Sequence, residues 1–465
     1  MRMVVVSSLR LLRRASPLVR LLVLSQLAFN TGFYLVLPFL AVHLASDLAL
    51  AAGTVALVLG LRTASQQGLF VVGGVLADRF GPRPLVLTGC AVRVVGFVVL
   101  GTSSSAGGVI TGALLTGVAA ALFSPAVESE LARAAGAPGA GLARREAFGL
   151  FSVAGQVGAL GGPVLGSVLL LVGFRTTCLV AAGVFVVVLA AHWRLLPRRA
   201  GSDSASPSDA TSATSATSAT GTQRAHLLSG ALGALREPVF LAVALAQAGY
   251  LAVYNQLYLA LPLELDRAGV SREVADVAVG VLFALAAALV VVGQMPALRW
   301  TGRRWSAPTT LLAGHGLLAA AVLAGALSRQ VGGAVPALAG SAVLVVLVAA
   351  GQMLLVPVGR DVVAALSPAS DLGARYGLVS TCGGAAVLLS SWLVGSVVDV
   401  AAPDGPARAL PWLVLALVPA ASALLLVAVR RHLVTPPSDD SVTASTDSAT
   451  SEAAGARTAQ GALST

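Results

Sequence analysis

Long apolar segments alternate with short polar stretches along almost the whole chain. An α-helix rises about 1.5 Å per residue, so about 20 apolar residues cross the roughly 30 Å hydrocarbon core of a bilayer. We therefore expect an all-α membrane protein with twelve transmembrane helices. The pattern places these helices at 18–45, 53–77, 85–105, 107–131, 147–172, 174–196, 238–263, 273–298, 307–328, 334–358, 376–400 and 408–430.

Two polar stretches interrupt this pattern and divide the chain. The first, 197–236, contains Ser-Ala-Thr repeats between Ala210 and Thr220, and the second, 433–465, is rich in Ser, Thr, Ala and Asp. Neither has the apolar periodicity of a packed element, so we expect a flexible linker and a disordered tail. Residues 1–196 and 237–432 then hold six spans each, which predicts two pseudo-symmetric six-helix bundles derived from an internal duplication.

The composition excludes most other classes of protein. Hydrophobic residues make up 57% of the chain and charged residues only 11%, against about a quarter charged in soluble domains. A soluble enzyme, a secreted disulfide module or a disordered protein does not fit these values. A β-barrel is also disfavoured, because its strands alternate in polarity and are short.

The distribution of charge predicts the orientation in the membrane. All 30 basic residues are Arg, and the formal net charge is +10. The Arg residues lie mostly in the short gaps between spans, as topology signals do, which argues against a nucleic-acid-binding protein. With both termini in the cytoplasm, the outer loops hold only Arg175, Arg267, Arg272, Arg329 and Arg408. We therefore expect a multi-pass protein of the cell membrane with cytoplasmic termini and linker.

The loop between the second and third spans reads GGVLADRFGPRP, from Gly73 to Pro84. Gly74 allows two helices to approach closely, and Asp78 can cap the next helix or pair with an Arg. The loop resembles the signature loop of the major facilitator superfamily, Gly-x-x-x-Asp-Arg-x-Gly-Arg-Arg. The resemblance implies a gating role for Gly74, Asp78, Arg79, Gly81 and Arg83. The corresponding loop of the second half keeps Gly302, Arg303 and Arg304 but has no acid.

A Gly-rich stretch in the fifth span, from Gly158 to Ser167, resembles the antiporter motif of drug exporters in the same superfamily. The matching residues are Gly158, Gly162, Pro163 and Gly166. Small residues at this spacing also favour plain helix packing, and Pro163 can kink the helix. Together with the stretches 60–68 and 121–125, the motif is similar to the twelve-helix, multidrug-resistance branch of the drug:proton antiporters.

The resemblance implies a transporter that exports small, drug-like organic molecules by alternating access and proton antiport. A transporter or facilitator for a single metabolite on the same fold is the alternative, and an anionic substrate would suit Arg62. An enzyme is not expected, because no cluster of His, Asp or Glu lies at one membrane face. No cofactor or metal site is indicated, and no His pair has the spacing of metal ligands. The expected partners are the substrate, protons and the lipid bilayer, and a monomer is expected.

Polar side chains recur on one face of the first span and on one face of the seventh, its counterpart in the second half. Such stripes face protein or a cavity rather than lipid, and sites of transporters lie between the halves. Polar contacts between helices would give the same pattern. The stripes consist of Gln26, Asn30 and Tyr34 in the first span and of Gln247, Tyr250, Tyr254 and Tyr258 in the seventh.

Ionisable residues inside a span are functional candidates because burying them costs free energy. Arg62 lies near the middle of the second span with Gln66 one turn later, so both are candidates for the cavity, although Arg62 could also be a structural anchor. Arg93 is close enough to the cytoplasmic end to extend to the surface. Candidates for proton coupling are Asp78, Glu128, Glu130 and His315.

Overall fold

The computed structural model describes residues 10–44, 48, 52–197, 233–331, 333–400 and 409–433. Most of the predicted linker and nearly all of the predicted tail lie outside these residues. Within them the chain is helical and has no strand. The helices are α2 (Pro17–Tyr34), α3 (Leu37–Val42), α4 (Ala52–Gly68), α5 (Phe70–Phe80), α6 (Pro82–Thr102), α7 (Ala106–Gly136), α8 (Arg144–Leu170), α9 (Phe174–Leu195), α11 (Pro238–Arg267), α12 (Arg272–Arg304), α13 (Ala307–Val331), α14 (Ala334–Ala365), α15 (Leu372–Val400) and α16 (Leu410–Val429).

The structure matches the predicted membrane spans except for 53–77, which is divided into two shorter helices. Among the described residues, 11 helical segments are long and apolar enough to cross a bilayer. The predicted span 53–77 corresponds to α4 and α5, which are interrupted at Leu69. The predicted span 18–45 contains α2 and α3, and it breaks just before Pro38, which has no N–H to donate to the preceding turn. The prediction of an all-α membrane protein is confirmed.

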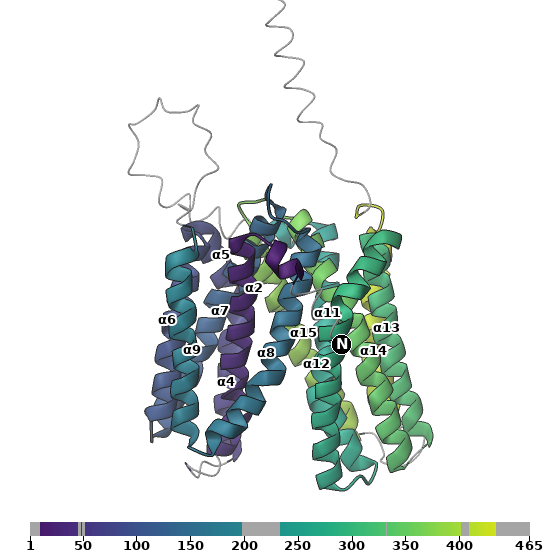
Figure 1. Ribbon diagram of the computed structural model, residues 1–465. Helices are drawn as coiled ribbons and strands as arrows, with labels where there is room; N and C mark the ends of the chain where they lie inside the picture. Colours follow the sequence, from purple (N-terminus) through teal and green to yellow (C-terminus); the bar gives the residue numbers. More distant parts are fainter. Residues whose placement is uncertain are drawn as a thin grey trace, which may run out of the picture.

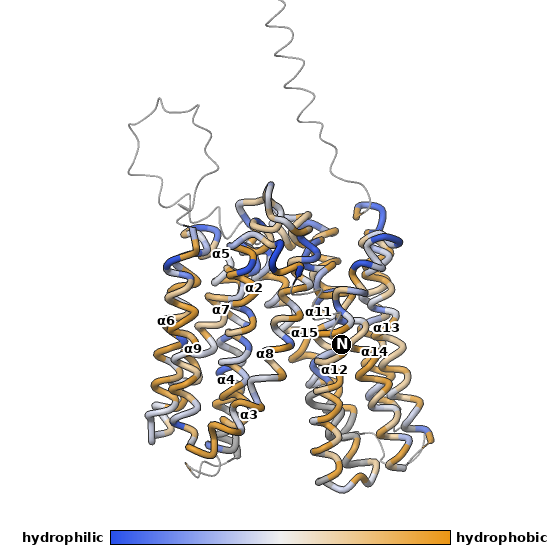
Figure 2. The backbone as a smooth tube through the Cα atoms, viewed as in Figure 1, coloured by the Kyte–Doolittle hydropathy of each residue, from blue (hydrophilic) through white to orange (hydrophobic). Residues whose placement is uncertain are grey.

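The helices form two groups, α2–α9 and α11–α16, called the first and second halves below (Figure 1). We call the end of the molecule where α9 finishes and α11 begins the linker end. The two halves lie against each other at the linker end, and their ribbons diverge toward the opposite end. The backbone is predominantly hydrophobic along the helices and most hydrophilic at the linker end (Figure 2).

The outer surface is apolar, as a bilayer requires. Large hydrophobic side chains such as Leu171, Val335 and Trp392 are between 70% and 87% exposed. In water such a surface would cause aggregation, whereas in a bilayer these side chains make favourable contacts with lipid tails. The apolar surface therefore encircles the helices, and polar chemistry is confined to the interior and the ends.

The sequence prediction that the Arg93 side chain extends to the membrane surface is wrong. Its side chain is fully buried among α2, α6, α7 and α9, and its Nη2 donates to the carbonyl oxygen of Thr116 at 3.0 Å. The guanidinium carbon lies 4.1 Å from the ring centre of Phe29 and 5.1 Å from that of Phe185. Cation–π attraction is stronger at such a desolvated site, so these rings offset part of the cost of burying Arg93, whose Nε and Nη1 have no hydrogen-bond partner among the described residues.

Candidate functional site

A cavity of about 180 Å³ lies between the two halves. Its walls come from α2 and α8 of the first half and from α11 and α14 of the second. They mix side-chain amides, tyrosines and one guanidinium with apolar groups, the composition of a site for an amphipathic organic molecule. The lining residues are Gln26, Asn30, Tyr34, Phe151, Ser152, Gly155, Gln156, Ala159, Tyr250, Leu251, Tyr254, Gln352, Val356 and Arg360.

The Gly-rich stretch of α8 holds the polar stripe of α2 in place. A Cβ at Gly158 would lie 2.6 Å from the carbonyl oxygen of Leu27, and one at Gly162 would lie 2.8 Å from Cβ of Tyr34. A Cβ at Gly166 would collide with the carbonyl oxygen of Leu35, just after α2, and Asn30 Nδ2 donates to the carbonyl oxygen of Gly155 at 2.9 Å. These glycines thus pack two helices of one half together, and Pro163 lies inside the same helix without ending it.

The polar stripe of α11 is divided between two chambers. Tyr250 and Tyr254 line the main cavity, with ring centres 5.8 Å apart. Gln247 lines a smaller adjoining chamber of about 70 Å³ and donates to the carbonyl oxygen of Leu355 at 3.3 Å. The side chain of Tyr258 lies outside the described residues.

An ion pair between the halves lies at the junction of the two chambers. Arg360 of α14 donates to Glu128 of α7 through Nη2 at 2.6 Å and through Nε at 3.1 Å. The Tyr376 hydroxyl donates to the carbonyl oxygen of Arg360 at 2.8 Å. A bidentate arginine–carboxylate contact is both strong and directional, so this pair fixes α7 and α14 relative to each other.

The two partners occupy corresponding positions in the two halves. Glu128 follows Pro125 by three residues in the fourth span of the first half, and Arg360 follows Pro357 by three residues in the fourth span of the second. The sequence prediction included Glu128 but missed Arg360. In each half a charged residue follows a proline inside the helix by three positions, and the two charges are opposite. This shared pattern is the sequence signal that could have identified Arg360 as the partner of Glu128.

Asp78 holds the halves together at the linker end. Its carboxylate accepts from the backbone N–H of Gly373 at 2.8 Å and of Ala374 at 2.6 Å, in the first turn of α15. Arg133 of α7 lies 3.1 Å from the same carboxylate and donates to the carbonyl oxygen of Ala369 at 3.1 Å. Asp78 therefore caps a helix of the other half, not the next helix in sequence, and a negative charge there is favoured by the helix dipole.

Glycines allow the close crossing of α5 and α15 beside Asp78. A Cβ at Gly74 would collide with the backbone of Gly373, and one at Gly377 would collide with the carbonyl group of Phe70. A third contact between the halves joins α8 to Asp361 of α14, with Arg145 at 3.5 Å and Arg144 at 3.8 Å. The linker end is therefore closed by backbone contact as well as by charge.

The remaining residues of the signature loop do not take part in the Asp78 contact. The guanidinium of Arg79 lies over the ring of Phe80 at 5.1 Å. Arg83 donates to the carbonyl oxygen of Trp193 at 2.6 Å, at the end of α9. Gly81 has a positive φ of 81°, which a glycine adopts without strain, and it separates α5 from α6.

Arg62 and Gln66 bind each other rather than lining the cavity. Arg62 Nη2 donates to Gln66 Oε1 at 2.7 Å, and its guanidinium carbon lies 4.5 Å from the ring centre of Phe33. Arg62 is 6% exposed. Phe33 and Tyr34 are neighbours on α2, and Tyr34 lines the cavity, so Arg62 lies behind the cavity wall.

Glu130 and His315 are both buried, and neither lines the two chambers. His315 places Nδ1 2.9 Å from the carbonyl oxygen of Leu311 and Nε2 3.0 Å from that of Ala246. It thus links α13 to α11 within the second half. A change in its charge would act inside one half rather than between the halves.

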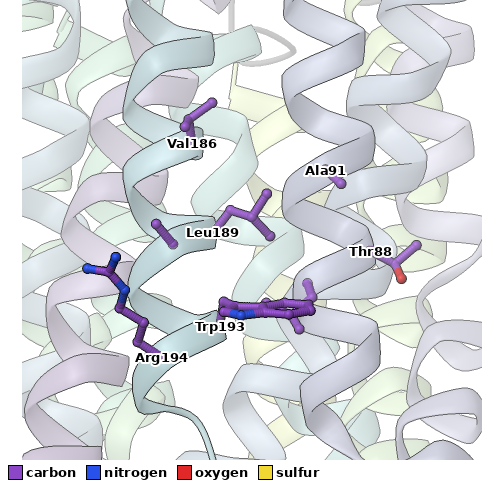
Figure 3. Close-up of a pocket in the computed structure, with 8 residues that line it drawn as sticks. Thr88, Ala91, Val186, Leu189, Trp193 and Arg194 are labelled. Carbon is purple, nitrogen blue, oxygen red and sulfur yellow. The ribbon is translucent and has the colours of Figure 1, made fainter.

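A groove of about 580 Å³ lies on the outer surface between α6 and α9. Figure 3 shows Trp193 extending across the space between the two helices, whereas Arg194 points away from it. The wall is otherwise made of small and apolar side chains such as Ala91 and Leu189. Because both helices belong to the first half and expose apolar faces here, the groove faces lipid and is no candidate for the substrate site.

Two helix groups that close at one end around a cavity between them have the architecture of a membrane transporter. The family sequence profile of the Major Facilitator Superfamily matches residues 22–343, and the chain belongs to this superfamily. An uncharacterized MFS-type transporter of Mycobacterium tuberculosis is 38% identical over 388 residues, 82% of this chain and 86% of that protein. The resemblance stated from the signature loop is thereby confirmed.

Two further proteins are more distant. The multidrug resistance protein MdtH of Yersinia pestis is 31% identical over 288 residues, 61% of this chain and 64% of that protein. The crystal structure of the human organic anion transporter MFSD10 superposes with a TM-score of 0.65 at 18% identity and covers 89% of this chain and 99% of that one. The latter likeness concerns the fold alone.

Proposed function

We propose that the protein exports small organic molecules across the cell membrane in exchange for protons. The cavity between the halves carries the proposal, because its amides, tyrosines and apolar groups suit molecules that are part aromatic and part polar. The similarity to a multidrug resistance protein supports export of drug-like compounds. The bacterial relatives support a location in the plasma membrane.

The Arg distribution supports a cytoplasmic position for the linker end. In that orientation the closed end faces the cytoplasm and the structure is the outward-facing form. Export then requires the contacts of Asp78 and of Glu128 with Arg360 to break, so that the cavity can accept substrate from inside.

A direct test of orientation uses single cysteines at Ser215 and Ser445, in a background without the three native cysteines. Both should resist an impermeant thiol reagent in intact cells and react after permeabilisation, because both positions are proposed to be cytoplasmic. A cysteine at Val172, which is 74% exposed near the opposite end, is the control expected to react in intact cells. Labelling of position 215 or 445 from outside would reverse the orientation.

Transport is tested in inside-out membrane vesicles with a panel of fluorescent organic compounds. Acidifying the lumen should drive accumulation of the substrate, and a protonophore should abolish it, because an uncoupled transporter cannot move substrate uphill. Accumulation that the protonophore leaves unchanged would reject proton antiport and keep export. Vesicles without the protein give the background.

A transporter of a single metabolite, possibly an organic anion, is the second candidate. Arg360 is the one cationic side chain among the residues that line the cavity, and it favours a negatively charged group there once its contact with Glu128 opens. Downhill equilibration of anionic dyes alone, regardless of the pH gradient, would favour this candidate over drug export.

A further inference from the structure

We propose that the groove between α6 and α9 binds one anionic phospholipid, with an acyl chain along the groove and the phosphate group at Arg83. The groove lies on the outer surface of the first half and is separate from the cavity between the halves. The proposal concerns a lipid partner and does not depend on the direction or the coupling of transport. Its basis is the shape of the groove together with the positive charge at its linker end.

The groove has the size and the lining of a site for an acyl chain. Its volume is about 580 Å³, and small side chains on both helices, Ala91 of α6 and Ala190 of α9, leave space between the larger ones. Val186 and Trp193 mark its extent on α9, about 10 Å along the helix by the rise per residue. Because this wall is apolar and open to the bilayer, hydrocarbon is the occupant that it favours.

Trp193 marks the end of the groove that lies nearest the membrane surface. It comes two residues before the end of α9, and its side chain extends across the space between the two helices (Figure 3). The side chain is 60% exposed. Tryptophan is enriched where the hydrocarbon of a bilayer meets its headgroups, because the ring is apolar and the indole N–H is polar. An acyl chain in the groove therefore joins its headgroup at the depth of Trp193.

Arg83 supplies a positive charge at this depth. Its guanidinium carbon lies 5.8 Å from the ring centre of Trp193, and its Nη2 donates to the carbonyl oxygen of Trp193 at 2.6 Å. These contacts hold the guanidinium at the linker end of the groove, one turn of α6 before Leu87, which lines the wall. A guanidinium has five N–H donors and binds phosphate oxygens well, so Arg83 can bind a phosphate group and keep its contact with Trp193.

The charge around the groove favours a headgroup with a net negative charge. No carboxylate is among the described residues that line the groove. The ammonium group of a zwitterionic lipid such as phosphatidylcholine therefore finds no partner there, whereas phosphatidylglycerol carries only a negative charge. Basic pockets between transmembrane helices bind anionic headgroups in this way. Arg194, the second Arg at the groove, points away from it (Figure 3), so it adds to the general positive potential rather than to the site.

The contacts of Arg83 place it outside the junction between the halves. The resemblance of the signature loop implied a gating role for Arg83, but its contacts with Trp193 lie within the first half. Among the described residues, α6 packs on α7 and α9, and α9 packs on α2 and α6, all of them helices of the first half. A lipid bound at Arg83 would therefore hold α6 and α9 together without touching the contacts that close the linker end.

Trp193 provides the measurement, because bromine atoms on an acyl chain quench tryptophan fluorescence on contact. The full chain is prepared with Trp193 as its single tryptophan, the other tryptophans being replaced by Phe, and a second protein keeps Trp300 alone. Trp300 is the matched control, since it is 47% exposed near the end of α12 and Arg304 lies over its ring at 5.3 Å. Both proteins are placed in phosphatidylcholine vesicles that contain brominated phosphatidylglycerol or brominated phosphatidylcholine at the same mole fraction.

Trp193 should be quenched about fivefold more effectively by brominated phosphatidylglycerol than by brominated phosphatidylcholine, the factor that one Arg near the surface contributes. The two lipids should quench Trp300 equally. Arg83→Gln should remove the selectivity at Trp193, and Arg83→Lys should keep most of it because the charge remains. Arg194→Gln removes the same charge from a side chain that points away, so it should have little effect. Ala91→Leu fills the groove and should lower the selective quenching without changing any charge.

Four results would overturn the proposal. Equal quenching of Trp193 by the two lipids would leave an ordinary lipid-facing surface. The same selectivity at Trp300 would show a general attraction of anionic lipid to the linker end. Selectivity that is unchanged in both Arg83→Gln and Ala91→Leu would place the lipid elsewhere. Quenching of Trp193 by neither lipid, with Trp300 quenched normally, would show that a protein surface such as a second copy of this chain covers the groove.

Discussion

Asp78→Asn should lower transport strongly while leaving the protein inserted and folded. The substitution removes the charge from an acceptor that binds two backbone N–H groups of α15 and Arg133. Hydrogen bonds to charged groups contribute about 1.5–3 kcal/mol each, so losing about 2 kcal/mol from the closed linker end lowers the ratio of closed to open forms about 30-fold. The measurement is transport in vesicles together with the accessibility of a cysteine at the linker end.

The neighbouring arginines provide matched controls for this prediction. Arg133→Gln should reproduce part of the defect, because Arg133 pairs with Asp78 and also contacts Ala369. Arg79→Gln should have little effect on the closed population, since its guanidinium lies over Phe80. Normal transport by a well-expressed Asp78→Asn protein would mean that Asp78 has no role in gating.

Gly74→Ala should prevent the linker end from closing. A methyl group at this position would collide with the backbone of Gly373, which is part of a helix and cannot rotate away as a side chain could. Overpacking of a tight contact costs about 1–3 kcal/mol, and here the cost falls on the closed state alone. We expect at least a tenfold loss of transport, measured with the same compounds in vesicles.

Gly68→Ala is the matched control, because the same methyl group would meet no atom within 4 Å there. Gly68 and Gly74 both belong to the second predicted span, so the effect of an added methyl group on helix stability should be the same at the two positions. An unchanged distance between spin labels at the linker end in Gly74→Ala would contradict the close crossing of α5 and α15. A defect in both variants would point to a general loss of folding.

The sequence was sufficient to predict the helices but not the contacts between the halves. Apolar segment length is a local property, so the spans followed from it, and α2 and α11 carry polar stripes that reach the cavity at Asn30 and Tyr254. The partner of Asp78 could not be predicted in this way. The partner is the backbone N–H of Gly373, nearly three hundred residues later in the chain. Almost every residue type has a backbone N–H, so the sequence does not indicate which one binds Asp78.

Charged residues inside the spans were the least predictable part. Arg93 was expected to extend to the membrane surface, but four phenylalanine rings from α2, α6 and α9 surround it. Those rings come from three different helices, and their convergence depends on packing that no single segment reveals. Arg62 behaves similarly, since its neighbours are Gln66 on its own helix and Phe33 on another.

The opposite charges at corresponding positions of α7 and α14 also determine which halves can associate. Two copies of the first half would bring two Glu128 carboxylates together, and two copies of the second would bring two Arg360 guanidinium groups together. Like charges at such a desolvated contact repel strongly, whereas the mixed pair attracts. If the gene were split at the linker, the two polypeptides would assemble as a one-to-one heterodimer.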